Sequence, residues 1–304
     1  MGEVDNMEKS KLVKNLKIFS AVVVLSVSSY NLHDMEIGTN YFHTTIEKQQ
    51  SFDDLGDYVL QGLCKCDDKY LLTAYDWWHN DTSIIYILDE DLKEYTIKKL
   101  DTYSHVGGIT YDPINQNIWI TDTNGTISCY AKEEILSTHK ITDTKRTVYV
   151  GDGLMNIFGD RSAAYVTYHD NKLYVGNFNF QNNTIIKEFE IKENGMIDTH
   201  DYREIKGPGF IQGITFYEDK ENDKKYLLTS SSFGRHFNSN LRIYDFNTLE
   251  KVNHIKTKEM MEEIIIDEDK LITVYESNAK NYNKKDEKGA DIIISNINKI
   301  LSKK

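Results

Sequence analysis

The sequence predicts an all-β fold made of five repeated units, and three observations support this prediction. A small or polar step followed by an apolar residue recurs at intervals of about fifty residues, which is the period of a repeat architecture. Short runs rich in β-branched and aromatic residues follow each step. Asp, Asn and Gly turns separate these runs, as expected of consecutive strands. The five steps are Gln61-Gly62-Leu63, Gly107-Gly108-Ile109, Ala163-Ala164-Tyr165, Gln212-Gly213-Ile214 and Glu262-Glu263-Ile264.

The runs after each step predict the remaining strands of the unit. Second strands are expected at 70–76, 117–122, 172–177, 226–230 and 270–276, and third strands at 83–89, 125–130, 184–189, 239–245 and 290–295. A fourth, more polar run closes most units, as at 95–100 and 251–255. Four strands per unit with the most polar strand last is typical of a propeller blade whose outer edge faces water. The sequence therefore predicts a five-bladed β-propeller with four-stranded antiparallel blades.

The fifth unit shows only three clear strands before the chain ends. A β-like run at 42–48 precedes the first unit and belongs to no repeat. We expect this N-terminal run to supply the outer strand of the fifth blade and close the ring, because closure protects edges that an open array would expose. The alternative is that 42–48 is a linker.

The N-terminal segment, residues 1–28, has the pattern of a secretory signal. Four lysines between Lys9 and Lys17 precede the apolar run Ile18–Val27, and the small residues Ser28 and Ser29 follow it. The run is shorter than the roughly 20 residues that cross a bilayer. We expect cleavage near Ser28 and a secreted or cell-surface protein, with membrane contact only through this segment. The alternative is a Val-rich buried strand.

Residues 29–304 are expected to form a single domain, because no Pro-, Gly- or Ser-rich linker divides them. The net charge of −12 argues against a nucleic-acid partner, since no basic face is available to replace phosphate counterions. Cys64 and Cys66 lie on one face of a predicted strand and Cys129 is remote, so we expect structural thiols.

A ligand site is expected at one mouth of the central channel, where the starts of the inner strands meet the neighbouring loops. His105 is either a ligand or base in the channel or a hydrogen-bond partner of the next blade. The Trp77-Trp78-His79 loop either stacks on a ligand or covers the tops of the blades. The predicted binding residues are Trp77, Trp78, His105, Arg161, Gln212, Arg235 and Glu262.

Carboxylates suggest a possible metal site at the same mouth. Asp122, Glu263 and Glu276 could bind calcium, because a hard cation prefers oxygen ligands. The alternative is a solvated acidic rim in a chain that already carries excess negative charge.

Several of these motifs resemble those of known β-propeller families. Phe210–Ile214, Leu228–Arg235 and Ser239–Asp245 look like blade signatures of secreted bacterial propellers in the gluconolactonase and regucalcin-like group. The chain is also similar to the five-bladed glutamine cyclotransferases, whose blades use a Gln-Gly-Leu step and a Glu-Ser pair. Here Gln61-Gly62-Leu63 and Glu276-Ser277 match these elements, although the pair does not follow a Gln-Gly step.

Two functions follow as expectations. The first is an extracellular propeller that binds a small ligand or a protein partner at one channel mouth. The alternative is an enzyme, either a calcium-dependent lactonase-like hydrolase or a glutamine-cyclotransferase-like enzyme. In the enzyme, Glu262 or Glu276 would act as general base or metal ligand.

Overall fold

The computed structural model of the chain describes residues 46–52, 55–141, 145–151, 163–179, 184–280, 282 and 290–302. The predicted signal segment and most of the predicted closing run lie outside these residues. No helix in the described part of the chain has the length and apolar character needed to span a bilayer.

The structure is a β-propeller of five blades, each a four-stranded antiparallel sheet, which confirms the predicted fold. The first blade contains β2 (Tyr58–Cys66), β3 (Lys69–Asp76), β4 (Ile84–Leu88) and β5 (Tyr95–Lys99). The second contains β6 (Ile109–Asp112), β7 (Asn117–Thr121), β8 (Thr126–Ala131) and β9 (Arg146–Tyr149). The third contains β10 (Tyr165–His169), β11 (Lys172–Gly176), β12 (Thr184–Ile191) and β13 (Ile197–Gly207).

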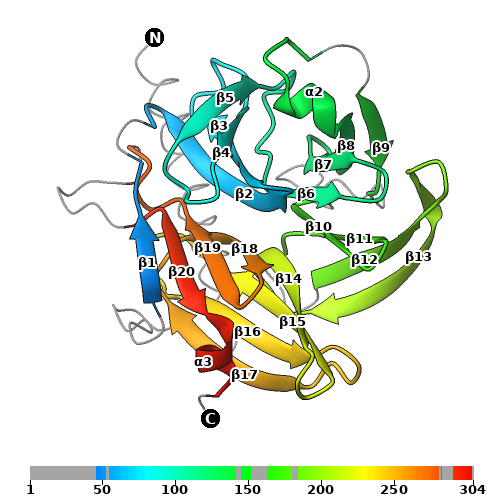
Figure 1. Cartoon of the computed structure of the whole chain (residues 1–304), viewed down its shortest axis with the longest axis vertical. Helices are drawn as coiled ribbons and strands as arrows, with labels where there is room; N and C mark the ends of the chain where they lie inside the picture. The colour runs from blue at the N-terminus through cyan, green and yellow to red at the C-terminus, as the bar shows by residue number, and fades with distance from the viewer. Residues whose placement is uncertain are drawn as a thin grey trace, which may run out of the picture.

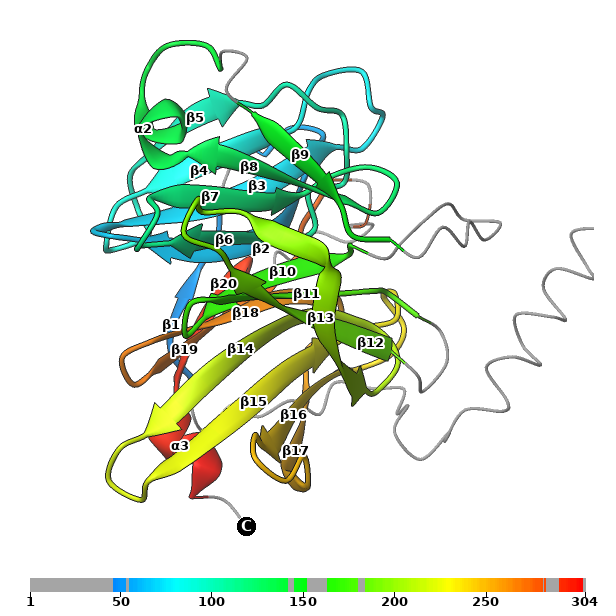
Figure 2. The ribbon, with the colours of Figure 1, turned by 90° about the vertical axis from the view of Figure 1, so that its right-hand side faces the viewer.

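The fourth blade contains β14 (Ile211–Asp219), β15 (Lys224–Ser231), β16 (Ser239–Asp245) and β17 (Lys251–Thr257). The fifth contains β18 (Met261–Asp267), β19 (Lys270–Tyr275), β20 (Ile292–Asn296) and β1 (Ile46–Gln50). Two short helices, α2 (Lys132–Leu136) and α3 (Ile297–Leu301), follow β8 and β20. Figure 2 views the ring from the side, with the first two blades above and the fourth below.

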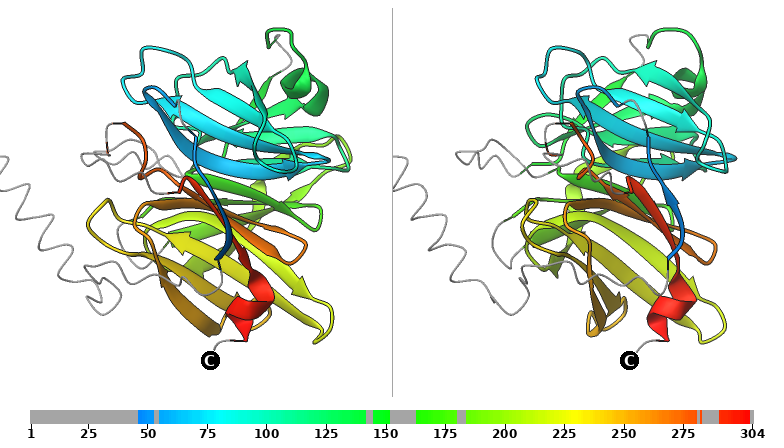
Figure 3. Two further views of the ribbon diagram at one scale, coloured as in Figure 1. Left: turned by 60° about the vertical axis from the view of Figure 1, so that its left-hand side comes forward. Right: turned by 90° about the vertical axis from the view of Figure 1, so that its left-hand side faces the viewer.

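The N-terminal strand closes the ring as expected: residues 46–48 of the predicted run belong to β1, which continues to Gln50, and residues 42–45 lie outside the described residues. β1 pairs antiparallel with β20, with Ile46 opposite Ser295 and Gln50 opposite Ile292 (Figure 3). Within β1 the residues alternate between half-buried and exposed, as expected of an outer strand. The fifth blade is therefore assembled from the two ends of the described chain.

The inner strands β2, β6, β10, β14 and β18 each contact the inner strands of both neighbouring blades, and together they surround the centre of the ring (Figure 1). The repeated step lies at the start of these strands. In three blades it coincides with an irregularity in pairing to the second strand, between Leu60 and Leu63, Ile211 and Gly213, and Met261 and Ile264. β6 and β10 begin at the last residues of their steps, Ile109 and Tyr165.

Close packing between blades explains the glycines of the step. A Cβ atom on Gly108 would lie 2.5 Å from the main-chain nitrogen of Val166, and one on Gly62 would lie 2.9 Å from that of Ile109. Near these glycines, the hydroxyl of Thr73 on β3 connects the first blade to the second. Thr73 Oγ1 accepts from Gly62 N at 2.8 Å and lies 2.8 Å from Val106 O.

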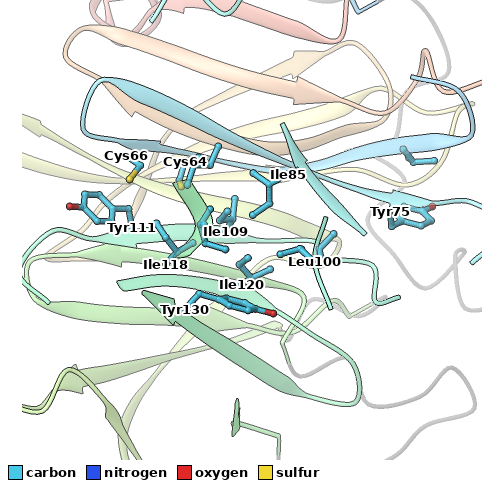
Figure 4. Close-up of a cluster of buried hydrophobic side chains, with 14 of the residues drawn as sticks. Cys64, Cys66, Tyr75, Ile85, Leu100, Ile109, Tyr111, Ile118, Ile120 and Tyr130 are labelled. Carbon is cyan, nitrogen blue, oxygen red and sulfur yellow. The ribbon is translucent and has the colours of Figure 1, made fainter. Parts of the chain in front are cut away.

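One buried hydrophobic cluster fills each of the five junctions between blades. Figure 4 shows the cluster between the first and second blades, where Ile85 faces Ile109 and Ile120. Cys64 and Cys66 belong to this cluster, and Cys129 lies in the next one. All three cysteines are free and buried, in agreement with the predicted structural thiols.

Candidate functional site

A cavity of about 380 Å³ opens at one mouth of the ring, and all five blades contribute to its wall. Its size falls within the range of small-molecule sites, roughly 300–1,000 Å³. The first residue of every repeated step lines it, namely Gln61, Gly107, Ala163, Gln212 and Glu262. The repeat therefore places five topologically equivalent residues around one cavity.

These equivalent residues divide the cavity into two halves of different chemistry. The fourth, fifth and first blades, which are consecutive around the ring, contribute the polar side chains of Gln212, Glu262 and Gln61. The second and third blades contribute Gly107 and Ala163, whose small size leaves space above them. Among the step residues, amide and carboxyl groups therefore lie on one side and small residues on the other, while His105, Asp122 and Asn124 of the second blade add further polar side chains to the wall.

A pair of carboxyl groups forms the centre of the polar half. Glu262 and Glu276 are hydrogen-bonded to each other. Gln212 Nε2 donates to Glu262 Oε1 at 3.3 Å, and Gln61 Nε2 donates to Glu276 Oε2 at 3.2 Å. Two amides thus hold the two acids in place.

The pair retains a proton near neutral pH. Burial, together with the charge of Glu276, raises the pKa of Glu262 well above its ordinary value. Burial raises the pKa of Glu276 to about 7, although the hydrogen bond from Gln61 opposes this shift. The proton therefore belongs to the pair, because two adjacent carboxyls that share a hydrogen bond titrate together.

Aromatic side chains support the carboxyl pair from behind. The Tyr75 and Tyr282 hydroxyls are hydrogen-bonded to each other. Burial raises the pKa of both phenols, and the charge of Glu276 raises it further. The Tyr75 ring lies 4.0 Å from that of His105, measured between centroids, and His105 lines the cavity. The cavity wall also contains Phe178, from the end of the second strand of the third blade.

The predicted binding residues have different positions. His105, Gln212 and Glu262 line the cavity, as does Asp122 from the predicted metal set. Trp77 packs edge-on against Tyr282 with centroids 4.9 Å apart, whereas Trp78 projects from the same loop with 59 % of its surface exposed.

Of the two remaining predicted residues, Arg235 is not among the described residues that line the cavity. The charge of Arg235 lowers the pKa of Tyr282, so this arginine lies near Tyr282. Arg161 lies outside the described residues.

The three residues of the predicted calcium site have different environments. Asp122 accepts hydrogen bonds from Thr102 and Ser128 and forms an ion pair with Lys145 at 3.1 Å. These groups lower its pKa, although burial opposes them. Glu276 belongs to the carboxyl pair. Among the described residues no group of three or more His, Cys, Asp or Glu is arranged to hold a metal ion, and calcium binding stays a prediction.

Glu263 follows Glu262 directly but does not share its environment. The irregularity in β18 sends Glu262 to the mouth cavity, while Glu263 lines a second cavity of about 150 Å³. Its Oε1 lies where a Cβ atom on Gly213 would be, and burial raises its pKa well above the ordinary range. Glu262 and Glu263 are adjacent in the sequence but line two different cavities.

Tyr75, Tyr282 and Phe178 were not among the predicted site residues. Phe178 directly follows the predicted end of a second strand at Asn177, so the repeat alignment could have identified it. Tyr282 lies in the connection between β19 and β20, where no periodic pattern marks its contacts.

No family model matches the sequence, and neither does any curated protein. Similar solved structures include glutaminyl cyclase from Myxococcus xanthus, at 9 % identity and a TM-score of 0.50 over 82 % of this chain and 94 % of that chain. A chain of a nidogen/laminin complex has 14 % identity and a TM-score of 0.45, covering 73 % and 74 % of the two chains. The WD40 β-propeller domain of Doa1 has 10 % identity and a TM-score of 0.42, covering 78 % and 80 %.

At these identities the likeness concerns the fold alone. Fold and cavity together define a five-bladed β-propeller with one ligand-sized, chemically asymmetric cavity at a channel mouth.

Proposed function

We propose that this protein binds a small molecule in the mouth cavity. One observation carries the proposal: the first residues of all five repeated steps surround a single cavity, with amide and carboxyl groups on one side and free volume on the other. A few convergent polar groups beside an open volume are the usual features of a small-molecule site. A concave cavity of this size favours a small molecule over a flat protein partner.

The compartment forms part of the same proposal. The lysines and the apolar run before Ser28 have the order of an export signal, so the ligand would be encountered outside the cytoplasm. Fractionation of cells that express the full chain tests this point. Recovery of the intact, uncleaved chain in the cytoplasm would exclude export.

Ligand screening with a cavity-blocking variant tests the binding function. A library of polar small molecules is screened for thermal stabilisation of the wild-type protein, since a ligand that binds the folded state raises its melting temperature. Ala164 lines the open half of the cavity, so Ala164→Leu should abolish stabilisation by a true cavity ligand. Thr123 lies exposed at the cavity rim, and Thr123→Trp provides a second block that leaves the core unchanged.

A matched control keeps this test specific. Thr96 lies exposed on the outer strand β5, and Thr96→Trp should leave ligand stabilisation unchanged. If no compound stabilises the wild type, or if stabilisation persists in both blocked variants, the mouth cavity is not the binding site.

A second candidate is an enzyme that transfers protons through the carboxyl pair. The specific observation in its favour is the contact between the carboxyl groups of Glu262 and Glu276, since burial raises the pKa of Glu276 to about 7 and such a carboxyl is suited to general acid–base catalysis. The glutaminyl cyclase of similar fold makes N-terminal glutaminyl peptides a reasonable first substrate, and lactones with added calcium a second. Turnover that Glu276→Gln abolishes would favour the enzyme. Binding without turnover would leave the first proposal standing.

A further inference from the structure

The charge of the mouth cavity is unbalanced. Its described wall contains Glu262 and Asp122 but no lysine or arginine, and Glu276 lies directly behind Glu262. Asp122 already has Lys145 as a partner. Among the described residues, the side-chain donors to the carboxyl pair are the neutral amides of Gln61 and Gln212. A buried acid that has no cationic partner among these residues is costly to ionise, which favours a proton on the pair.

The cavity also offers surfaces that suit an organic cation. Phe178 lines the wall, and the His105 ring packs at a tilt against that of Tyr75, with centroids 4.0 Å apart. Aromatic faces next to a carboxylate are favourable surroundings for an ammonium group. Gly107 and Ala163 leave room for the body of the ligand on the opposite side.

We propose that the ligand of the mouth cavity is a small organic amine, whose ammonium group contacts the carboxyl groups of Glu262 and Glu276. This inference rests on the proposed binding function and specifies its ligand class. The ammonium contacts the carboxyl pair in the polar half, and an apolar or aromatic body occupies the space over the second and third blades. The net charge of −12 additionally favours the approach of a cation.

Proton release accompanies binding in this arrangement. An ammonium beside the carboxyl pair stabilises its charged form, which lowers the pKa of the pair and releases a proton near pH 7. Amine affinity therefore rises as the pH increases through about 7, the pKa of Glu276. Among the described residues, the other titratable or charged groups that surround the pair or line the cavity are Tyr75, His105, Asp122, Arg235, Glu263 and Tyr282.

Three probes with the same body and different head groups test the ligand class. Binding of 2-phenylethylamine, 2-phenylethanol and 3-phenylpropionate to the full chain is measured by isothermal titration calorimetry. The amine should bind at least about tenfold more tightly than the alcohol, and the acid should bind most weakly, because opposite charges favour and like charges disfavour contact with the pair. Repeating the amine titration in two buffers of different ionisation enthalpy should show release of up to about one proton at pH 7.

Isosteric variants assign the effect to the carboxyl pair. Glu276→Gln and Glu262→Gln should each weaken amine binding about tenfold or more and remove the proton release, while binding of the alcohol changes little. Glu204 lies exposed on the outer strand β13, and Glu204→Gln is the matched control for net charge alone. Circular dichroism melts of each variant verify that the protein remains folded.

The outcomes separate this inference from the function on which it rests. Binding of the alcohol or the acid that exceeds amine binding and disappears in Ala164→Leu would overturn the amine class and keep the small-molecule function. Equal effects of Glu276→Gln and Glu204→Gln would also overturn it. If no amine binds and no library compound shows cavity-dependent stabilisation, both proposals fail.

Discussion

Glu262 and Glu276 are hydrogen-bonded to each other at the floor of the mouth cavity, although one belongs to the inner strand of the fifth blade and the other follows its second strand. The two positions that the repeat makes equivalent in every blade, the start of the inner strand and the end of the second, thus meet at one point. In this blade both positions carry acids, and their contact produces a buried carboxyl pair.

The carboxyl pair should make stability depend on pH. The pKa of Glu276 is raised from 4.5 to about 7 in the folded protein, so the folded state holds a proton that the unfolded state has lost. This stabilising contribution is fully present below pH 4.5 and is lost as the pH rises through about 7, a change of roughly 1–3 kcal/mol. The free energy of unfolding, measured with urea at pH 5 and at pH 8, should differ less between the two pH values for Glu276→Gln than for the wild type. An equal difference in the two proteins would show that the pair does not hold this proton.

Gly108→Ala should destabilise the ring by about 1–3 kcal/mol, because the added Cβ would lie 2.5 Å from the main-chain nitrogen of Val166 in the next blade. The clash involves main-chain atoms, so a side-chain rotation cannot relieve it. Ala164 is the equivalent residue of the third step and already has a Cβ, so Ala164→Gly is the matched control with an expected cost near 0.5–1 kcal/mol. Denaturant midpoints of the two variants compare these costs, and equal midpoints would contradict close packing at Gly108.

Thr73→Val should cost about 1–3 kcal/mol, because it preserves the shape of the side chain but leaves the buried Gly62 N–H without its hydrogen-bond partner. The same change removes the hydroxyl contact to Val106 O in the next blade. Thr96→Val on the exposed strand β5 is the control and should change stability by less than about 0.5 kcal/mol. Thermal melts should therefore separate the two valine variants. If they coincide, the hydroxyl does not connect the blades.

Removal of β1 should expose the edge of β20 and promote association between chains. A chain that begins at Ser51 lacks the pairing of Lys48 with Ile294 and of Gln50 with Ile292. A chain that begins at Ile46 retains it and serves as the control. Size-exclusion chromatography and thermal melts should show aggregation and a lower melting temperature only for the shorter chain. Monomeric behaviour of both would mean that β1 is dispensable.

The sequence predicted most of the fold because the step, the turns and the strands recur at a nearly constant period. Gly62 and Gly213 are required wherever neighbouring blades approach closely, so they mark the same position in different blades. The closing strand was predicted to end at residue 48 but continues to Gln50, since an outer strand with one exposed face has a weak hydrophobic pattern.

The site was less predictable than the fold. Gln212 and Glu262 were found because they occupy equivalent positions in the repeat, but the repeat does not show which carboxyls meet. The grouping of Glu263 with Glu276 overlooked the irregularity in β18, which directs neighbouring side chains to different cavities. Tyr282 lies in a connection without periodicity, and its contact with Tyr75 depends on tertiary packing alone.

The pairing of β1 with β20 also governs when the protein can finish folding. The first blade is synthesised early and can form its own sheet, but β1 has no partner until β20 at the far end of the chain has been made. This contact spans nearly the whole sequence, and contacts of such large separation form slowly. Until β20 has been made, the four earlier blades can form only an incomplete arc, and the pairing of β1 with β20 is the contact that turns this arc into a ring.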